Sequence, residues 1–453
     1  MRSKTLNMTE GSPVRLLIVF AIPMLIGNLF QQFYNLVDSI VVGKYVGAEA
    51  LAAVGATGSV SFLFFALCNG VGSGGGIITA KQFGAGNEEE VKKTIVNSGY
   101  ILFAGSLVVG LIAFMLAGPL LRFMATPENI LQDATLYMRM QCLGLPLVAV
   151  YNHSSSMLRA LGDSKSPLYF LVFACLLNVG LDVWFVYGFG MGVFGAALAT
   201  MIAQLTAGAS CLFYAVKSNP YFKLEKRHFK PIKSIIWETV RLGVPLSLQF
   251  ALVAISCMAL QRVVNSYGSV VVAAFTAADR VEQLLHQPYG TLSAALATYC
   301  GQNLGAGKME RIKQGFKKSV IMMLIFSMIM LPIMQFGGEW IVSLFVDDPE
   351  VIRYGAAALK ITSLFYVFLG TINVARGVLN GVGDAIFALI NGIVEVAGRV
   401  VFPVILVAIP MVGVWGIWWS AGLVWFFSAL SCVWRYISWR KKNIPARELP
   451  SNS

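Results

Sequence analysis

The chain has 453 residues, of which 57% are hydrophobic and only 12% charged, and its formal net charge is +12. A soluble domain carries about 25% charged residues, so this composition excludes a soluble globular protein. Long apolar runs cover nearly the whole chain and leave no room for a sizeable soluble domain between them. We therefore expect a polytopic membrane protein whose function resides in the lipid bilayer.

The apolar runs predict twelve membrane-spanning helices, six in each half of an all-α polytopic membrane protein. In chain order they begin near Val14, Leu51, Val91, Ile130, Pro167, Val193, Ile235, Val270, Lys313, Val351, Ala385 and Val414.

The two halves are copies of one sequence. Pro23 aligns with Pro245 at a shift of 222 residues, and Gly162 aligns with Gly383 at a shift of 221 after one deletion. The shared prolines predict a bend or hinge in the first helix of each copy, because proline removes a backbone donor. A duplicated membrane body is the plan of many secondary transporters.

The duplication and the charge pattern predict four parts. These are an N-terminal six-helix lobe at 1–216, a basic cytoplasmic hinge loop at 217–233, a C-terminal six-helix lobe at 234–440 and a cytoplasmic tail at 441–453. Basic residues gather in alternate connections, which places both termini in the cytoplasm and argues against a nucleic-acid partner. The seven scattered cysteines indicate packing thiols rather than disulfides or a metal site.

Four polar residues of the N-terminal lobe are the candidate cation site: Asp38, Asn178, Asp182 and Thr200. Asn178 and Asp182 share a helix face, and helical rise places Asp182 about 22 Å from the start of its span, in the outer half of the bilayer. The same calculation from helical rise places Asp38 and Thr200 at a similar depth in the bilayer. In the second copy Asp38 faces Leu260, Asn178 faces Arg399 and Asp182 faces Pro403.

Two carboxylates, an amide oxygen and a hydroxyl suit a hard cation such as Na⁺. The same cluster would hold a proton, because two neighbouring carboxylates in a low dielectric resist being charged together. The alternative is structural: Asp38 would pair with Lys44 at the membrane interface, and Asp182 would cap a short turn.

Ionisable residues of the second lobe are candidates too, since charge at membrane depth is costly. Glu395 and Arg399 are four residues apart and could neutralise each other, and Gln249, Gln261, Asn373 and Asn391 could serve as interhelical hydrogen-bonding residues. Candidate residues of a substrate cavity are Gln31, Tyr34, Phe65, Met157, Met258, Gln261, Glu282, Arg280 and Arg399.

The sequence contains no complete nucleotide-binding or metal-binding motif of a soluble enzyme. Gly307-Lys308 lacks the first glycine of a P-loop, and the three histidines have no metal-ligand spacing. We expect neither an enzyme nor a cofactor beyond a coupling ion.

The chain resembles the multidrug and toxic compound extrusion (MATE) family along nearly its whole length. The most specific segments are 37–43, 47–53, 82–86 and 159–164, together with Asn178 and Asp182. The resemblance implies two six-helix lobes around a central cavity that opens alternately to either side. It also assigns Asp38, Asn178, Asp182 and Thr200 to a cation site like that of archaeal and DinF-like members.

The resemblance further implies export of amphipathic, often cationic compounds in exchange for inward H⁺ or Na⁺. The expected protein is a monomer in the cell membrane, with small molecules and the lipid bilayer as its partners. The alternatives are a flippase for lipid-linked precursors, which Arg280 and Arg399 would serve, and an uncoupled channel or sensor.

Overall fold

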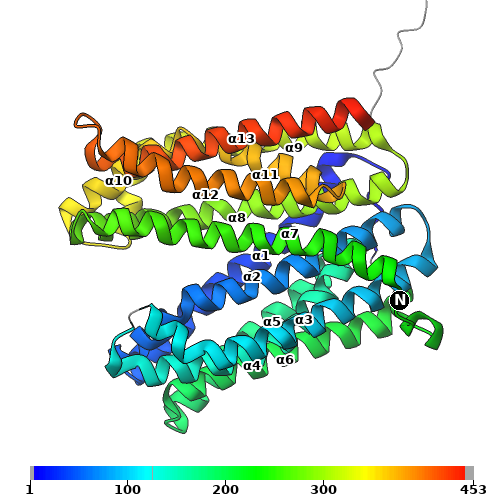
Figure 1. Ribbon diagram of the computed structural model, residues 1–453, viewed down its shortest axis with the longest axis horizontal. Helices are drawn as coiled ribbons and strands as arrows, with labels where there is room; N and C mark the ends of the chain where they lie inside the picture. The colour runs from blue at the N-terminus through cyan, green and yellow to red at the C-terminus, as the bar shows by residue number, and fades with distance from the viewer. Residues whose placement is uncertain (1–4, 125, 444–453) are drawn as a thin grey trace, which may run out of the picture. The chain divides into compact units, whose positions relative to one another are not determined.

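The structure is a computed structural model that describes residues 5–124 and 126–443, apart from the side chains at positions 48, 59, 60, 63, 67, 68, 254, 258 and 259. This part of the chain is almost entirely helical (Figure 1). Its long helices are α1 (Pro13–Tyr45), α2 (Ala48–Gly84), α3 (Glu88–Phe123), α4 (Glu128–Ala160), α5 (Lys165–Asp182), α6 (Gly192–Ser218), α7 (Lys233–Asn265), α8 (Ser269–Gly305), α9 (Met309–Ser343), α10 (Pro349–Ser363), α11 (Tyr366–Gly381), α12 (Ala385–Val407) and α13 (Gly416–Asn443).

The predicted helix starts agree with these bounds to within four residues. The tenth predicted span differs because it is broken: α10 and α11 meet at an angle of 54°. The start of α10 follows from its sequence, since Pro349 suits the first helical position and the Asp348 side chain accepts hydrogen bonds from the backbone N–H groups of Glu350 and Val351. If α10 and α11 form one span, the described chain contains twelve helical spans, as predicted.

Among the described residues, eight helices are each long and apolar enough to cross a membrane, and the α10–α11 pair makes a ninth. Of the remaining three long helices, α4 and α8 carry more polar residues, whereas α2 is as apolar as the spans counted here. Helix α4 packs against α2, α3 and α6, and α8 packs against α9, α10 and α11. Protein neighbours therefore surround these two helices and shield their polar side chains from lipid.

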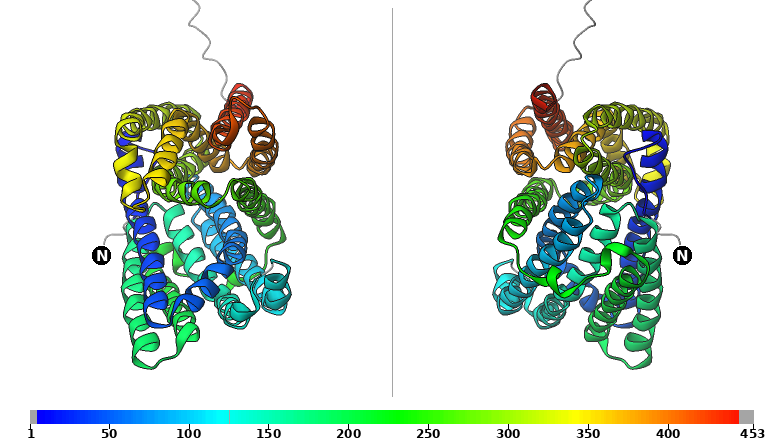
Figure 2. Two further views of the ribbon diagram at one scale, coloured as in Figure 1. Left: turned by 90° about the vertical axis from the view of Figure 1, so that its left-hand side faces the viewer. Right: turned by 90° about the vertical axis from the view of Figure 1, so that its right-hand side faces the viewer.

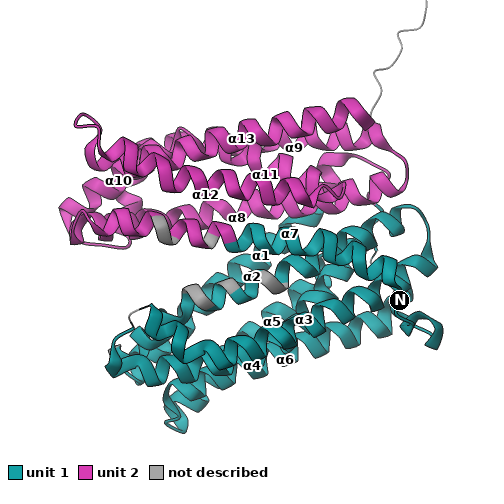
Figure 3. Cartoon of the chain, in the orientation of Figure 1, with its two compact units in different colours: residues 1–7, 19–251 teal, residues 8–18, 252–453 magenta. Residues whose placement is uncertain are grey.

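The chain divides into two compact units, which Figure 3 colours separately. Unit 1 comprises Met1–Asn7 and Val19–Ala251, and unit 2 comprises Met8–Ile18 and Leu252–Ser453. Within each unit the long helices run side by side as a bundle (Figure 2). The division falls inside α1 and α7, whereas the lobe boundaries expected at 217–233 stay a prediction.

The duplication extends to backbone conformation. Gly162 and Gly383, which end the fourth span of one copy and the broken tenth span of the other, have φ angles of +89° and +86°. Only glycine adopts this region freely. At Gly162 a Cβ atom would also lie 2.2 Å from the carbonyl oxygen of Leu6, so the turn requires glycine for space as well.

The interior of the helix bundle in unit 1 holds small residues, and large apolar side chains face outward. In unit 1, α4 presents Ala134 and Met138 to Ala113 and Ala117 of α3, all fully buried, while Met115 is 70% exposed. This distribution is typical of membrane bundles, in which small residues permit close packing and lipid covers the outer apolar side chains. The six cysteines with described side chains are free thiols, as predicted.

The hinge segment, residues 217–233, docks on α3 within unit 1. The buried Asn97 accepts a hydrogen bond from the backbone N–H of Ile232 at 2.7 Å, and its amide donates to the carbonyl of Lys230 at 3.4 Å. The Tyr100 hydroxyl donates to the carbonyl of Phe229 at 2.8 Å. The loop is also held by side chains, since Arg227 and the buried His228 both pair with Glu89 of α3, at 3.2 and 3.1 Å, while its lysines remain exposed to solvent.

Candidate functional site

The structure brings Asp38 and Asp182 together in unit 1. Asp38 lies in the second half of α1, and Asp182 is the last residue of α5, directly before the π-helical segment Val183–Gly188. Both are buried, with exposed fractions of 7% and 0%. Their carboxyl groups are in hydrogen-bonding contact with each other.

Neither structural alternative for the two acids appears in the structure. The Lys44 ammonium lies 5.8 Å from the centre of the Tyr45 ring, and the described residues show no ion pair between Lys44 and Asp38. Asp182 makes no capping hydrogen bond with its side chain at the start of the π-helical segment. The two acids instead lie against each other in the interior of unit 1.

Asn178 and Thr200 join α5 to α6 beside the acids. The amide of Asn178 donates to Thr200 Oγ1 at 3.5 Å, and the threonine hydroxyl donates to the carbonyl of Ala196 at 3.1 Å. Asn178 is 1% exposed and lies one helical turn before Asp182. All four predicted residues therefore lie in the parts of α1, α5 and α6 that belong to unit 1.

Two tyrosines complete the surroundings of Asp38. Tyr34 lies one turn before Asp38 on α1, interacts with both acids and is hydrogen-bonded to the Gln204 side chain. Tyr137 of α4 interacts with Asp38 and is hydrogen-bonded to Gln141. Tyr137, Gln141 and Gln204 were missed by the sequence analysis, although each lies at a helical spacing from another polar residue.

This arrangement can hold a small positive charge. The Oδ1 atom of Asp38 is buried and accepts no hydrogen bond from the described protein. The described structure shows no lysine, arginine or histidine paired with it. Two full negative charges about 4 Å apart repel each other by about 4 kcal/mol at an effective dielectric constant of about 20. A bound cation or proton would remove this repulsion, and the carboxylate, amide and hydroxyl oxygens fit Na⁺.

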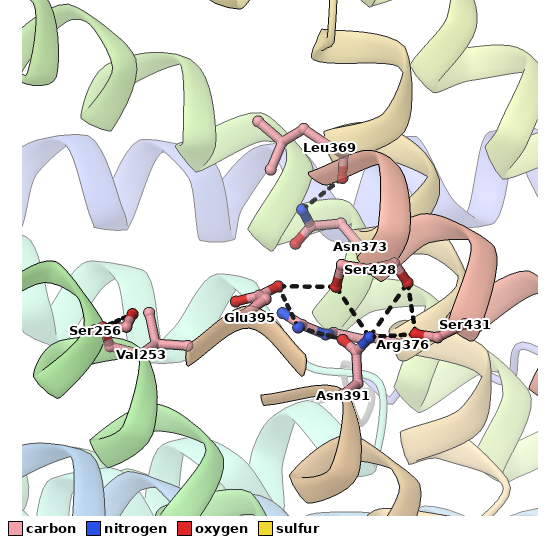
Figure 4. Close-up of polar contacts among 9 residues, drawn as sticks. All are labelled: Val253, Ser256, Leu369, Asn373, Arg376, Asn391, Glu395, Ser428 and Ser431. Carbon is pink, nitrogen blue, oxygen red and sulfur yellow. Dashed lines mark hydrogen bonds and ion pairs between the residues drawn. The ribbon is translucent and has the colours of Figure 1, made fainter. Parts of the chain in front are cut away.

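A polar network occupies the corresponding interior of unit 2, and it contradicts one predicted pairing. Glu395 of α12 forms an ion pair with Arg376 of α11, not with Arg399 (Figure 4). The amide of Asn391 donates to the hydroxyls of Ser428 and Ser431 of α13, at 2.9 and 2.8 Å. The pairing differs because Arg376 approaches Glu395 from a neighbouring helix, which the spacing within α12 cannot reveal.

Asn391 thus has the interhelical role that the sequence suggested. Asn373 instead donates to the carbonyl of Leu369 in its own helix, at 2.9 Å. Gln261 likewise bonds within α7, to Asn265 at 2.8 Å.

The predicted cavity residues lie in varied surroundings. Met157 is fully buried in a hydrophobic cluster with Val91 and Ile95, where its sulfur accepts a hydrogen bond from Thr79. Because its side chain is fully buried among apolar neighbours, Met157 is a packing residue and does not line a cavity. Methionine fills cores as readily as it lines binding surfaces, so the sequence alone could not tell these roles apart. The others are distributed as follows: Gln31 and Arg280 are exposed, Tyr34, Phe65, Gln261, Glu282 and Arg399 are half-buried, and the side chain of Met258 lies outside the described residues.

Comparison with known proteins shows which family the chain matches. A family model described as MatE matches residues 23–184 and 245–405, once in each copy of the repeat. Probable multidrug resistance protein YpnP of Bacillus subtilis (strain 168) is 29% identical over 396 residues, covering 86% of this chain and 88% of the relative. Probable multidrug resistance protein YoeA of the same strain is 28% identical over 454 residues, covering 97% of each chain.

The fold matches a solved structure as well. A crystal structure of MATE in the bent conformation superimposes with a TM-score of 0.90 at 25% identity, covering 98% of this chain and 100% of the other. The predicted family resemblance is therefore confirmed over the whole fold.

Proposed function

Because the chain belongs to the MatE family of membrane transporters, we propose that it is a secondary active antiporter that exports amphipathic cationic compounds in exchange for H⁺ or Na⁺. The observation that carries the proposal is the buried contact between Asp38 and Asp182. The names of YpnP and YoeA, both probable multidrug resistance proteins, support the substrate class.

The acid pair is the coupling site in this proposal. An incoming cation or proton neutralises Asp38 and Asp182, while Asn178 and Thr200 supply neutral oxygens from α5 and α6. Tyr34 and Tyr137 both interact with Asp38, whose side chain is buried. A positive charge bound at the acid pair changes the free energy of one conformation of the transporter more than that of the other.

Coupling needs two conformations that the cation and the drug stabilise differently. Helix α1 contains both Asp38 and Pro23, so the proline offers a bend in the same helix that carries one acid. Cation binding shifts this helix, weakens drug binding and permits release to the outside. The protein acts as a monomer in the cell membrane, with both termini in the cytoplasm.

A flippase for lipid-linked precursors is the second candidate. Arg280 and Arg399 favour it, because phosphate groups require cationic partners. Arg399, however, lies within electrostatic range of both Glu282 and Glu395. Carboxylates beside the guanidinium disfavour a phosphate ligand, which makes the flippase the weaker proposal.

The test is ethidium efflux from proteoliposomes under an imposed pH gradient or, separately, a Na⁺ gradient. Wild type should export under one of the two gradients, and Asp38→Asn should abolish that export while inserting normally. Asp133→Asn is the matched control, since Asp133 is an exposed carboxylate of α4 in the same unit. Wild-type export that ignores both gradients, or an Asp38→Asn protein that exports normally, would refute the antiporter.

A further inference from the structure

The outward face of α3 marks where the hydrocarbon core of the bilayer begins in unit 1. Between Lys93 and Arg122 this helix carries no charged residue, and Tyr100, Phe103 and Leu107 are exposed on it. From Tyr100 to Arg122 the helix rises about 33 Å, close to the roughly 30 Å thickness of a hydrocarbon core. Tyr100 therefore lies at the boundary with the lipid headgroups, where tyrosine is common in membrane proteins.

The hinge segment, residues 217–233, approaches this boundary along α3. His228 Nε2 lies 3.1 Å from the carboxylate of Glu89 near the start of α3, and the Tyr100 hydroxyl donates to the carbonyl of Phe229. Glu89 and Tyr100 are about 16 Å apart along the helix axis. The hinge therefore docks first at a level well outside the hydrocarbon core and reaches the headgroup level at Phe229.

The exposed side chains at this level are aromatic or basic. Phe229 and Trp237 are 50% and 67% exposed, and Lys230, Lys233 and Arg241 are exposed as well. Lys233, Trp237 and Arg241 recur at every fourth residue, so they lie on one face of α7. We call Lys230, Lys233 and Arg241 the interfacial cations.

The opposite face of α7 packs into unit 1. Thr239 is fully buried, and a Cβ atom at Gly243 would lie 2.7 Å from the Cα atom of Val71 in α2. The face that carries Trp237 is therefore turned away from the bundle. One heptad further along that face, Val244 and Leu248 are both 42% exposed. The face thus passes from cations and tryptophan to apolar residues, as expected where a helix passes from headgroups into hydrocarbon.

The interfacial cations have no acidic partner. Glu225 of the hinge and Glu89 of α3 both pair with Arg227, at 2.9 and 3.2 Å. Glu238, the acid in the first two turns of α7, lies 3.9 Å from Lys81. Within the described ranges 5–124 and 126–443, no carboxylate forms an ion pair with an interfacial cation. Three positive charges therefore face the surroundings of the protein uncompensated.

We propose that the interfacial cations, together with Trp237, bind the headgroups of anionic phospholipids such as phosphatidylglycerol. Ammonium and guanidinium groups donate to phosphate oxygens, and a tryptophan ring suits the boundary between headgroups and acyl chains. A soluble anion would balance the charges but leave Trp237 and Phe229 in water, whereas a lipid covers both. The proposal requires only that the chain lies in a bilayer, so its failure would not bear on antiport.

The experiment reconstitutes the full-length protein in vesicles of phosphatidylcholine and phosphatidylglycerol in equal amounts. One of the two lipids is brominated near the top of its acyl chains, because bromine quenches the fluorescence of tryptophans that it contacts. Subtracting the fluorescence of Trp237→Phe from that of the parent protein isolates the signal of Trp237. In wild type this signal should be quenched more strongly by brominated phosphatidylglycerol than by brominated phosphatidylcholine.

The variants remove the interfacial cations one step at a time. A lysine or arginine close to an anionic surface contributes about fivefold to binding. Lys230→Gln/Lys233→Gln should therefore lower the preference for phosphatidylglycerol by at least about tenfold, and Arg241→Gln should lower it by about fivefold. Arg241→Gln keeps the test available should the double variant be unstable.

Lys223→Gln/Lys226→Gln is the matched control. It removes the same charge from exposed hinge residues that precede His228. At the level of Glu89 these lysines are about two Debye lengths from the boundary in about 0.15 M salt, so the preference should stay at the wild-type value. Folding of each variant is checked by a single symmetric elution peak and a melting temperature close to that of wild type.

Three results would overturn the proposal. One is equal quenching of wild-type Trp237 by the two brominated lipids, or no quenching by either. Another is an equal loss of preference in the two double variants, which would reflect net charge alone. The third is a preference that inorganic phosphate removes and sodium chloride of the same ionic strength does not, which would assign the surface to a soluble anion.

Discussion

Arg376 of α11 and Glu395 of α12 form a buried ion pair in unit 2, with side chains exposed by only 14% and 6% (Figure 4). The Ser428 hydroxyl donates a further hydrogen bond to Glu395 at 3.2 Å. Polar atoms of α11, α12 and α13 are thereby tied together. A buried pair contributes most visibly when one partner is removed, because the other is then left as an uncompensated charge.

Arg376→Met should therefore destabilise the protein by about 3–5 kcal/mol, and the double variant Arg376→Met/Glu395→Leu should recover much of that loss. The melting temperature of the detergent-solubilised protein measures both effects. Arg353→Met is the control, since its pair with Glu350 spans 3.8 Å and both side chains are more than half exposed. That change should cost at most about 1 kcal/mol. Equal losses from Arg376→Met and Arg353→Met would contradict a structural role for the buried pair.

Thr200→Val should weaken the apparent affinity for the coupling ion without preventing transport. The change removes one neutral oxygen from the proposed site and the partner of Asn178, at a cost of about 1 kcal/mol or roughly fivefold in affinity. The measurement is the dependence of ethidium efflux on the concentration of the driving ion.

Thr206→Val is the matched control, because Thr206 also lies on α6 and its hydroxyl also donates to a carbonyl of its own helix, that of Ile202 at 2.8 Å. If both variants shift the ion dependence equally, the effect belongs to the helix rather than to the site.

Much of this fold could be predicted because the bilayer fixes the length of each apolar run. The start expected near Val193 is an example, since α6 begins at Gly192. The meeting of Asp38, Asn178 and Asp182 was predictable for a related reason. Helical rise gives the depth of each residue, and only a few polar residues share one depth.

Pairings between neighbouring helices could not be predicted in this way. Arg376 approaches Glu395 from another helix, while the sequence offered Arg399 at the helical spacing. The surroundings of Met157 could not be predicted from the sequence either. An apolar residue in an apolar run carries no sign of whether it faces the core, the lipid or a cavity, and here it faces the core.

Asn97→Ala should release the hinge segment, residues 217–233, from α3. It removes the acceptor of the Ile232 N–H and the donor to Lys230, and it leaves the half-buried Ile232 N–H without its partner. The hinge is rich in lysine and arginine, so trypsin should cleave the variant faster there than wild type. Cleavage is followed by gel electrophoresis of the native protein in detergent.

The control for the hinge is Asn87→Ala, at the residue directly before α3. Asn87 is exposed, and its side chain donates only a long hydrogen bond of 3.4 Å to Gln82. Its cleavage rate should match wild type. An Asn97→Ala protein that resists trypsin as wild type does would show that the hinge is held by other contacts.

Gly74→Ala should destabilise unit 1 by disturbing the contact of α2 with α7. A Cβ atom at position 74 would lie 2.7 Å from the backbone nitrogen of Gly243, and the obstacle is backbone that cannot rotate away. Overpacking of this kind costs about 1–3 kcal/mol. Gly58→Ala on the same helix has no atom of the described residues within 4 Å of the new methyl group. It should be neutral or stabilising, because alanine favours helix by up to about 1 kcal/mol. Melting temperatures that fall for Gly74→Ala and not for Gly58→Ala would establish that these helices need glycine for close approach, whereas two unchanged values would show that α2 and α7 are not in contact at this point.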